Sequence, residues 1–146
     1  MRHSWHESET ALLFVYGTLR RGHAHPMARR LAVSARYLGR GRANGRLYRI
    51  DHYPGLRLSA RPREWVTGDL YDLSAVPALL ARLDRYERLG MERRRRGEYA
   101  RVMAQVWTVE TAPRQAWVYL YRKPVARLTR LFRGDFLRER RRHPWR

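Results

Sequence analysis

Hydrophobic positions in the first third of the chain form short runs and alternations that are typical of β-strands. The apolar run Ala11–Tyr16 ends at Gly17, which predicts a buried strand followed by a turn. Residues 36–50 contain three glycines and the pair Asn44-Gly45. Because Asn-Gly readily forms a two-residue turn, this segment predicts a hairpin of two strands.

Strand patterns continue along the rest of the chain. The turn Tyr53-Pro54-Gly55 introduces a brief strand over 56–60. Residues 64–73 alternate as a strand, in which Gly68 marks a bulge or a close contact. Aromatic and β-branched residues over 99–109 and 115–121 predict an antiparallel pair. Many short strands with few helices indicate an α+β fold, a compact mixed β-barrel or sheet with flanking helices.

Two segments have helical spacing instead. Residues 25–31 predict a short helix opened by Pro26. The segment 76–88 predicts an amphipathic helix with Ser74 as its N-cap. Its apolar stripe consists of Val76, Leu79, Leu80, Leu83 and Tyr86. At roughly 100° per residue, Glu87 projects into this stripe rather than toward solvent.

An inward carboxylate such as that of Glu87 must be hydrogen-bonded, paired with a cation or kept protonated, because burying a bare charge is costly. A residue in that position is a candidate general acid or base. The alternative is a structural ion pair with one of the many arginines, since ion-pair networks also place carboxylates in unusual positions. The pattern of the helix leaves both interpretations open.

The charge of the chain adds an expectation about partners. It has 32 basic and 13 acidic residues, for a net charge of +19. Such a charge favours nonspecific, salt-sensitive adhesion to polyanions. Lys123 is the only lysine among the basic residues, and arginines extend from Arg2 to Arg146. The excess therefore indicates a compositional bias as much as a dedicated phosphate-binding surface.

Length and composition narrow the class further. The 146 residues, 44% of them hydrophobic, predict a single folded domain over 11–137, a flexible N-terminus over 1–10 and a basic C-terminal tail over 138–146. No apolar run approaches the ~18 residues of a membrane span, and the first residues lack the apolar core of a signal peptide. We therefore expect a cytoplasmic protein without membrane contact. The absence of cysteine excludes disulfides and thiol nucleophiles, and the histidines lack metal-ligand spacing, so neither metal nor cofactor is expected.

The segment Tyr16-Gly17-Thr18-Leu19-Arg20-Arg21-Gly22 is a second candidate for chemistry. A glycine directly after a buried strand lets the backbone turn sharply, which leaves peptide N–H groups free to face a carboxylate or a developing oxyanion. The alternative is an ordinary glycine turn followed by a solvated arginine pair. The pattern of a phosphate-binding loop is absent.

Several motifs follow one another in a fairly specific order: Tyr16-Gly17-Thr18-Leu19-x-x-Gly22, Tyr53-Pro54-Gly55-Leu56, Gly68-Asp69-Leu70-Tyr71, Leu83-Asp84-x-x-Glu87, Tyr99-x-Arg101, Val118-Tyr119-x-Tyr121 and Gly134-Asp135-Phe136. With these motifs the chain resembles the γ-glutamylcyclotransferase-like family, also called AIG2-like, along most of its length. The resemblance implies a compact mixed barrel whose pocket lies where the first loop meets the helical glutamate. The final motif is expected to pack back on the barrel, and Arg140–Arg146 to fray.

The resemblance also implies an activity and a small-molecule γ-glutamyl substrate. Such an enzyme cyclises the γ-glutamyl group to 5-oxoproline and releases an amine or amino acid, without a metal. Glu87 matches the family's catalytic glutamate, which acts as general base and then as general acid. The substrate-binding residues implied are Tyr16, Gly17, Thr18, Leu19 and Tyr99. The leaving group and the oligomeric state stay open.

Some features depart from the family pattern. His23-Ala24-His25 stands where bacterial members often carry Asn-x-His, and Arg88-Leu89 follows Glu87 where the family often has glycine. The basic insertion 91–97 either rims the pocket or is a solvated loop.

A non-catalytic protein that binds a ligand or nucleic acid on the same fold is the alternative function. Nucleic-acid binding would be favoured if aromatic residues formed a platform on which bases stack. Four aromatic residues alternate as strand residues do and are instead expected in the sheet core: Trp107, Trp117, Tyr119 and Tyr121.

Overall fold

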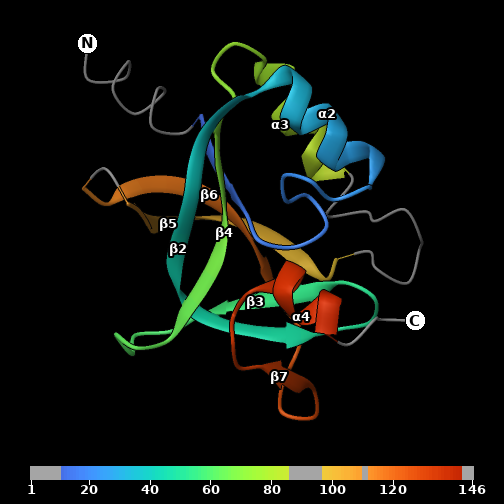
Figure 1. Cartoon of the computed structure of the whole chain (residues 1–146), viewed down its shortest axis with the longest axis vertical. Coiled ribbons are helices and arrows are strands. Elements are labelled where there is room, and N and C mark those ends of the chain that lie inside the picture. Colours follow the sequence, from blue (N-terminus) through green and yellow to red (C-terminus); the bar gives the residue numbers. More distant parts are fainter. Residues whose placement is uncertain (1–10, 86–96, 110–111, 143–146) are drawn as a thin grey trace.

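The structure, a computed structural model, describes residues 11–85, 97–109 and 112–142 (Figure 1). Seven strands and three helices occur in this part of the chain. In order they are β1 (Leu12–Val15), α2 (Pro26–Ser34), β2 (Arg36–Arg49), β3 (Pro54–Leu58), β4 (Trp65–Asp72), α3 (Pro77–Asp84), β5 (Tyr99–Thr108), β6 (Arg114–Tyr121), β7 (Thr129–Leu131) and α4 (Phe136–Arg142).

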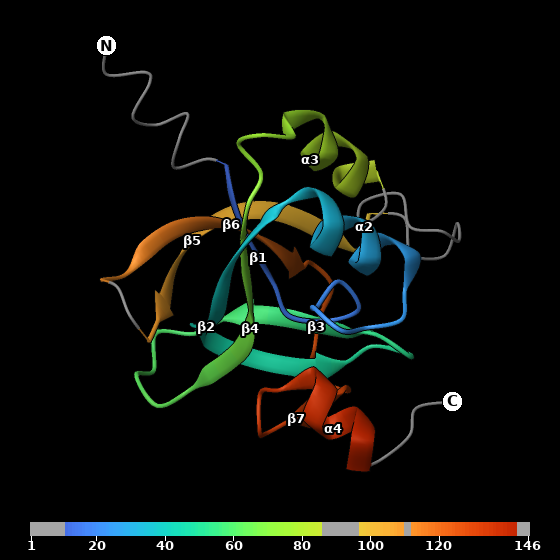
Figure 2. The ribbon, with the colours of Figure 1, turned by 45° about the horizontal axis from the view of Figure 1, so that its top comes forward.

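Five of the strands close into a barrel. Strand β1 pairs with β4, β4 with β2, β2 with β5, β5 with β6, and β6 returns to β1 through a parallel contact of Leu13 with Trp117. Strand β3 bridges β2 and β6, and β7 adds to β2. Figure 2 shows α2 and α3 together at one end of this barrel and α4 at the opposite end. The predicted α+β fold, a mixed barrel with flanking helices, is confirmed.

Strand β1 is apolar throughout because both of its faces are covered. Phe14 lies in a core cluster that also contains Val66 and Val118 of β4 and β6. Leu13, on the other face, lies in a second cluster that includes Leu31 of α2. A strand buried on both faces carries a continuous apolar run instead of an alternation. Burial on both sides fixes the position at which β1 ends and the following loop begins.

Strand β4 contains the close contact predicted at Gly68. A Cβ atom at this position would lie 2.3 Å from the carbonyl oxygen of Val15 and 2.5 Å from the ring of Phe14. Only glycine allows β1 and β4 to approach this closely at the end of β1. The predicted antiparallel pair of late strands is also confirmed, since β5 and β6 pair from Tyr99↔Tyr121 to Val106↔Arg114.

The hairpin predicted within residues 36–50 is wrong. Residues 36–49 form one long strand, in which Asn44 pairs with Trp65 of β4 and Gly45 with Leu58 of β3. A Cβ atom at Gly45 would lie 2.7 Å from the carbonyl oxygen of Arg57. This glycine serves close packing of neighbouring strands rather than a turn.

The start of the helix predicted over residues 76–88 also differs from the prediction. Helix α3 begins at Pro77 with Val76 as its N-cap, and no side chain caps it. Ser74 instead lies in a turn, where its backbone N–H donates to Oδ1 of Asp72 (2.8 Å). The earlier helix, α2, begins at Pro26 as expected.

The Gly134-Asp135-Phe136 motif packs back on the barrel as predicted, with Phe136 fully buried in the barrel cluster. Helix α4 runs to Arg142 and so crosses the expected boundary between domain and tail at residues 137 and 138. The remaining tail residues, 143–146, lie outside the described part, as do residues 1–10, and the proposed domain division stays a prediction. Each of the described helices is too short or too polar to span a bilayer.

Candidate active site

The loop that follows β1 turns sharply beside β3. The N–H of Arg20 donates to the carbonyl oxygen of Gly17 (3.0 Å), which closes the turn. A Cβ atom at Gly17 would lie 2.8 Å from Cγ of Pro54. The loop can therefore lie against the start of β3 only because residue 17 has no side chain.

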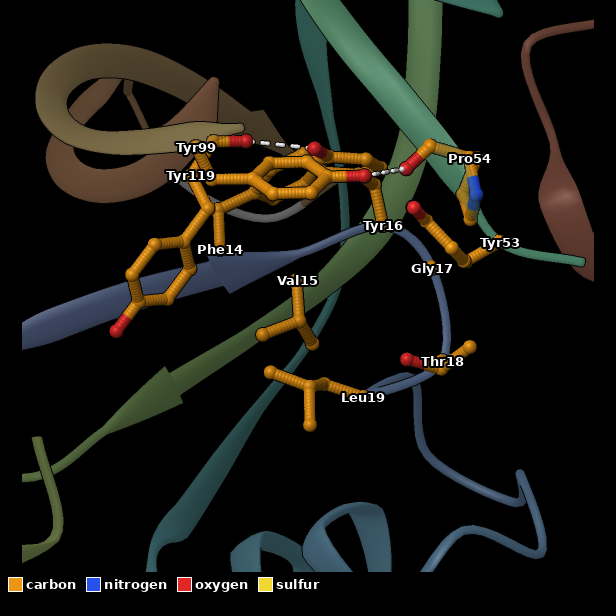
Figure 3. A pocket seen from close by; sticks show the side chains of 10 residues that line it. All are labelled: Phe14, Val15, Tyr16, Gly17, Thr18, Leu19, Tyr53, Pro54, Tyr99 and Tyr119. Atoms are coloured by element: carbon orange, nitrogen blue, oxygen red, sulfur yellow. Dashed lines mark hydrogen bonds between the residues drawn. The ribbon is translucent and has the colours of Figure 1, made fainter. Parts of the chain in front are cut away.

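A small hollow of about 30 Å³ lies between this loop and the strands around it (Figure 3). Its walls are Phe14, Val15, Tyr16, Gly17, Thr18, Leu19, Tyr53, Pro54, Tyr99 and Tyr119. All five residues predicted to bind substrate, Tyr16 to Leu19 and Tyr99, are among them. Residues more than a hundred positions apart in the chain thus meet at one place.

The tyrosine hydroxyls in the wall hold the backbone in place. The Tyr16 hydroxyl donates to the carbonyl oxygen of Tyr119 (2.6 Å) and accepts from the N–H of Leu56 (3.2 Å). The Tyr99 hydroxyl donates to the carbonyl oxygen of Pro54 (2.7 Å), as Figure 3 shows. Because both hydroxyls are committed to peptide groups, Tyr16 and Tyr99 shape the hollow rather than offer polar groups to it.

The polar groups that the loop offers are its peptide N–H groups and the hydroxyl of Thr18, a wall residue. The N–H groups of Arg20 and Arg21 are used, by Gly17 and by Oδ2 of Asp69 (2.9 Å) respectively. Within the described residues, no acceptor is found for the N–H groups of Gly17, Thr18 and Leu19. Consecutive N–H groups in a turn suit a carboxylate or an oxyanion.

A buried arginine anchors the loop from behind. Arg20 is 1% exposed, and its guanidinium contacts Oδ2 of Asp69 through Nε (3.2 Å) and Oδ1 of Asp135 through Nη1 (2.7 Å). These contacts join the loop to β4 and to the segment before α4. The alternative of a solvated arginine pair is wrong for Arg20, although Arg21 is exposed.

The predicted catalytic Glu87 lies outside the described residues. The structure does describe the helix that leads to it. Asp84, in the last turn of α3, accepts from the Tyr119 hydroxyl (2.7 Å) and from Nη2 of Arg101 (3.0 Å). These bonds attach the end of α3 to a wall residue of the hollow, three residues before Glu87.

A second carboxylate, that of Glu98, was missed by the sequence reasoning. Glu98 is 6% exposed, and its Oε1 accepts from the hydroxyl of Tyr53 (2.8 Å), another wall residue. Its position next to a charged loop gave no periodic signal that would have marked it as buried. Among the described glutamates, Glu98 is the one that accepts a hydrogen bond from a wall residue of the hollow.

Two tyrosines of the second core cluster, which do not line the hollow, have raised pKa values. Burial raises the pKa of Tyr121, and the charge of Glu98 adds to that effect. Burial also raises the pKa of Tyr71 to about 12, with a further contribution from the Asp69 carboxylate. Tyr71 and Tyr121 are therefore protonated at neutral pH and cannot serve as bases.

The histidines near the loop have structural contacts. Nδ1 of His25 accepts from the N–H of Met27 and caps α2, and Nδ1 of His23 accepts from the N–H of His25 (both 3.1 Å). Across the described ranges, no three side chains of the kinds that bind metals gather into a potential metal site.

Comparison with known proteins places this barrel and loop in a class. The solution structure of ytfP from Escherichia coli matches with a TM-score of 0.58 at 32% identity, over 88% of this chain and 97% of that one. An AIG2-like protein from Mus musculus matches with a TM-score of 0.61 at 25% identity, over 86% of this chain and 87% of that one.

The sequence comparisons identify the family. The gamma-glutamylcyclotransferase family protein ytfP of Citrobacter rodentium is 34% identical over 127 residues, which are 86% of this chain and 94% of that protein. The family model described as gamma-glutamyl cyclotransferase, AIG2-like, matches residues 13–138. The chain belongs to this family, as the motifs indicated.

Gly17→Ala tests whether the close approach at the loop shapes the hollow. The new Cβ would lie within 3.0 Å of two Pro54 side-chain atoms, so the loop must shift by some tenths of an ångström. We expect the midpoint of urea unfolding to fall modestly and any turnover of a γ-glutamyl substrate to fall roughly 10²-fold, since small misplacements are costly in catalysis. Gly22→Ala separates steric contact from backbone strain, because its Cβ would meet nothing within 4 Å whereas its φ of +89° disfavours a side chain, so this variant should lose stability without reshaping the hollow. Equal activity of Gly17→Ala and the native protein would contradict this role.

Proposed function

We propose that this protein is a γ-glutamyl cyclotransferase, which converts a γ-glutamyl amine into 5-oxoproline and the free amine. The observation that carries the proposal is the hollow at the end of β1, where the loop amides of residues 17–19 meet the walls contributed by Tyr53 and Tyr99. Family membership supports the same reaction class.

In the proposed reaction, the α-amino nitrogen of the substrate attacks its own γ-carbonyl carbon. A carbon–nitrogen bond closes the five-membered ring, and the bond from that carbon to the leaving nitrogen breaks. Glu87 takes a proton from the attacking ammonium and returns it to the leaving nitrogen. The loop N–H groups stabilise the oxygen that becomes negative as the tetrahedral intermediate forms.

A sparse site is sufficient for this chemistry. Both reacting groups belong to one molecule, so the protein has to hold the substrate in a folded conformation and move one proton. Orientation of this kind contributes up to roughly 7–11 kcal/mol at the best effective molarities. The reaction as proposed has no step that needs a metal or a covalent nucleophile.

The size of the hollow bears on substrate choice. A volume of about 30 Å³ has room for one or two waters, and so for a carboxylate or an oxyanion rather than for a whole substrate. We therefore assign the loop to the γ-glutamyl end and place the leaving amine outside the hollow. Amino acids, isopeptide-linked lysine and small polyamines remain candidates for it.

The direct test is a panel of γ-glutamyl amino acids, γ-glutamyl-ε-lysine and γ-glutamyl polyamines, incubated with the protein and analysed for 5-oxoproline by mass spectrometry. We expect catalytic turnover of at least one member, unchanged by a chelator of divalent metals. A panel that yields no ring product above the buffer rate would reject the enzyme proposal and leave a ligand-binding role. The cytoplasmic location stays a prediction.

A further inference from the structure

A second and larger concavity lies on the outer face of the barrel. Its volume is about 340 Å³, and it is lined by Arg40, Gly41, Arg42, Thr67, Trp107, Thr108, Val109, Asp135 and Arg138. We call it the outer groove. It shares no lining residue with the hollow of the candidate active site. Its volume falls within the range of roughly 300–1,000 Å³ that is usual for small-molecule sites.

The strand register explains why these side chains meet. Arg42 of β2 lies opposite Thr67 of β4 on one side and opposite Trp107 of β5 on the other. Successive residues of a strand point to opposite faces, and Gly41 and Ala43 are buried. Arg42 and Arg40, which are exposed, therefore point outward together.

The segment before α4 supplies the remaining wall. The N–H of Thr67 donates to the carbonyl oxygen of Gly134 (2.7 Å), and Gly134 has φ +63°. A Cβ atom at Gly134 would lie 2.1 Å from the carbonyl oxygen of Trp65, so glycine permits this contact. The contact positions Asp135 and Arg138 beside β2 and β4.

The outer groove is strongly positive. Arg40, Arg42 and Arg138 are exposed, and none of them forms an ion pair with a carboxylate of the described residues. Among the described lining residues the one carboxylate is that of Asp135, which is bonded to the buried Arg20 and to the N–H of Arg138 (3.2 Å). Because Arg20 also pairs with Asp69, it offsets the charge of Asp135 only in part, but the three arginines among the described lining residues outweigh the remainder and favour an anion.

An aromatic surface lies next to these charges. Trp107 is half-buried, belongs to neither core cluster, and packs edge-to-face with Trp65 at 5.3 Å between ring centroids. The Arg42 guanidinium lies 4.4 Å from the centroid of the Trp65 ring. The expectation that Trp107 belongs to the sheet core is therefore wrong. Val109, 94% exposed, adds an apolar edge to the groove.

We propose that the outer groove binds a nucleoside phosphate, either free or as one unit of a single-stranded nucleic acid. Guanidinium groups match phosphate oxygens in geometry and charge. A nucleobase stacks on an aromatic side chain whatever its identity. The groove arginines, which form no ion pair with a described carboxylate, lie beside Trp107. This arrangement suits a ligand that combines an anionic group with a flat ring. This inference does not depend on the proposed enzymatic activity.

A charge-matched pair of variants tests the anion half of the proposal. Arg40→Gln with Arg42→Gln removes two groove charges, and Arg29→Gln with Arg30→Gln removes two exposed charges of α2, none of which line the groove. Binding of a fluorescent single-stranded oligonucleotide is measured by anisotropy over a salt series. We expect the groove variant to bind at least roughly tenfold more weakly and its log–log salt slope to fall by about 1.4, and the α2 variant to change little. Equal losses in both variants would reduce the binding to charge adhesion and reject the groove.

The proposed stacking of the nucleobase on Trp107 is tested with small molecules. Adenosine monophosphate, adenosine and ribose 5-phosphate are titrated against the native protein and followed by isothermal titration calorimetry, which does not depend on Trp107. We expect the monophosphate to bind more tightly than either fragment, and Trp107→Leu, checked for folding by circular dichroism, to weaken it several-fold while Trp107→Phe largely retains it. A monophosphate that binds as tightly as the oligonucleotide would identify a free nucleotide as ligand, and an oligonucleotide that binds far more tightly but is displaced by excess monophosphate would identify a strand. An oligonucleotide that excess monophosphate does not displace would bind elsewhere and overturn the proposal. Ribose 5-phosphate binding as tightly as the monophosphate, or unchanged binding by Trp107→Leu, would overturn the proposal.

Discussion

Replacing Glu87 by glutamine is expected to lower kcat for 5-oxoproline release by roughly 10²- to 10⁴-fold, the range of a lost general acid–base group. Glutamine keeps the size of glutamate and one acceptor oxygen but cannot take up the ammonium proton. KM and the unfolding midpoint should change little, because the carboxylate is proposed to move a proton rather than to bind or to stabilise. Initial rates with the best substrate of the γ-glutamyl panel provide the measurement.

The matched control is Glu98→Gln. The Glu98 carboxylate is buried and accepts from the Tyr53 hydroxyl, a bond that an amide oxygen can also accept. We therefore expect this variant to fold and to retain turnover within about an order of magnitude. Full activity of Glu87→Gln together with an inactive Glu98→Gln would transfer the proton shuttle to Glu98. If neither variant loses turnover, catalysis by either carboxylate is excluded from the mechanism.

The parts of the fold that local sequence determines were predictable. The apolar run ending at Gly17 indicated a buried strand, and β1 is covered on both faces because the same run serves two clusters. Gly68 stood out as an unfavourable residue in a strand, and the structure shows the close approach of Val15 that requires it. In both cases a single residue or a short local run carries the signal, so no knowledge of distant partners was needed.

The predictions that were wrong or missed concern features that depend on residues distant in the sequence. Asn44-Gly45 has the composition of a turn, but pairing with two neighbouring strands keeps it extended, and those partners are not visible in the local sequence. The burial of Glu98 depends on Tyr53, 45 positions away. Trp107 alternates like a core residue, yet in a barrel alternation does not say which face is inside. Long-range pairing decides all three.

The loop of the candidate site combines both cases. Sequence reasoning placed Tyr16 to Leu19 and Tyr99 at one site, and they line one hollow. It did not reveal what Tyr16 does there, because its hydroxyl bonds to backbone groups of β6 and β3. At Tyr16 the motif thus reflects a packing requirement.

Arg20→Ala is expected to reduce the free energy of unfolding by about 3–5 kcal/mol, the usual cost of removing one partner from a buried ion pair. The substitution leaves the carboxylates of Asp69 and Asp135 buried without their cation. Urea unfolding followed by circular dichroism measures the loss. The neighbouring Arg21, exposed and 4.3 Å from the Tyr37 ring centroid, is the control. Arg21→Ala should cost only about 0.5–1 kcal/mol.

A triple variant distinguishes two causes of the stability lost in Arg20→Ala, uncompensated charge and lost packing. In the triple variant Arg20→Met, Asp69→Asn and Asp135→Asn, the volume is nearly kept and no charge remains to be compensated. Replacing a whole buried ion network by neutral groups is often close to neutral, so we expect this variant to recover most of the stability lost in Arg20→Ala. If the triple variant is as unstable as the single one, the arginine acts through its packing. Recovery would instead show that Arg20 acts through its charge, which it shares between the carboxylates of Asp69 and Asp135.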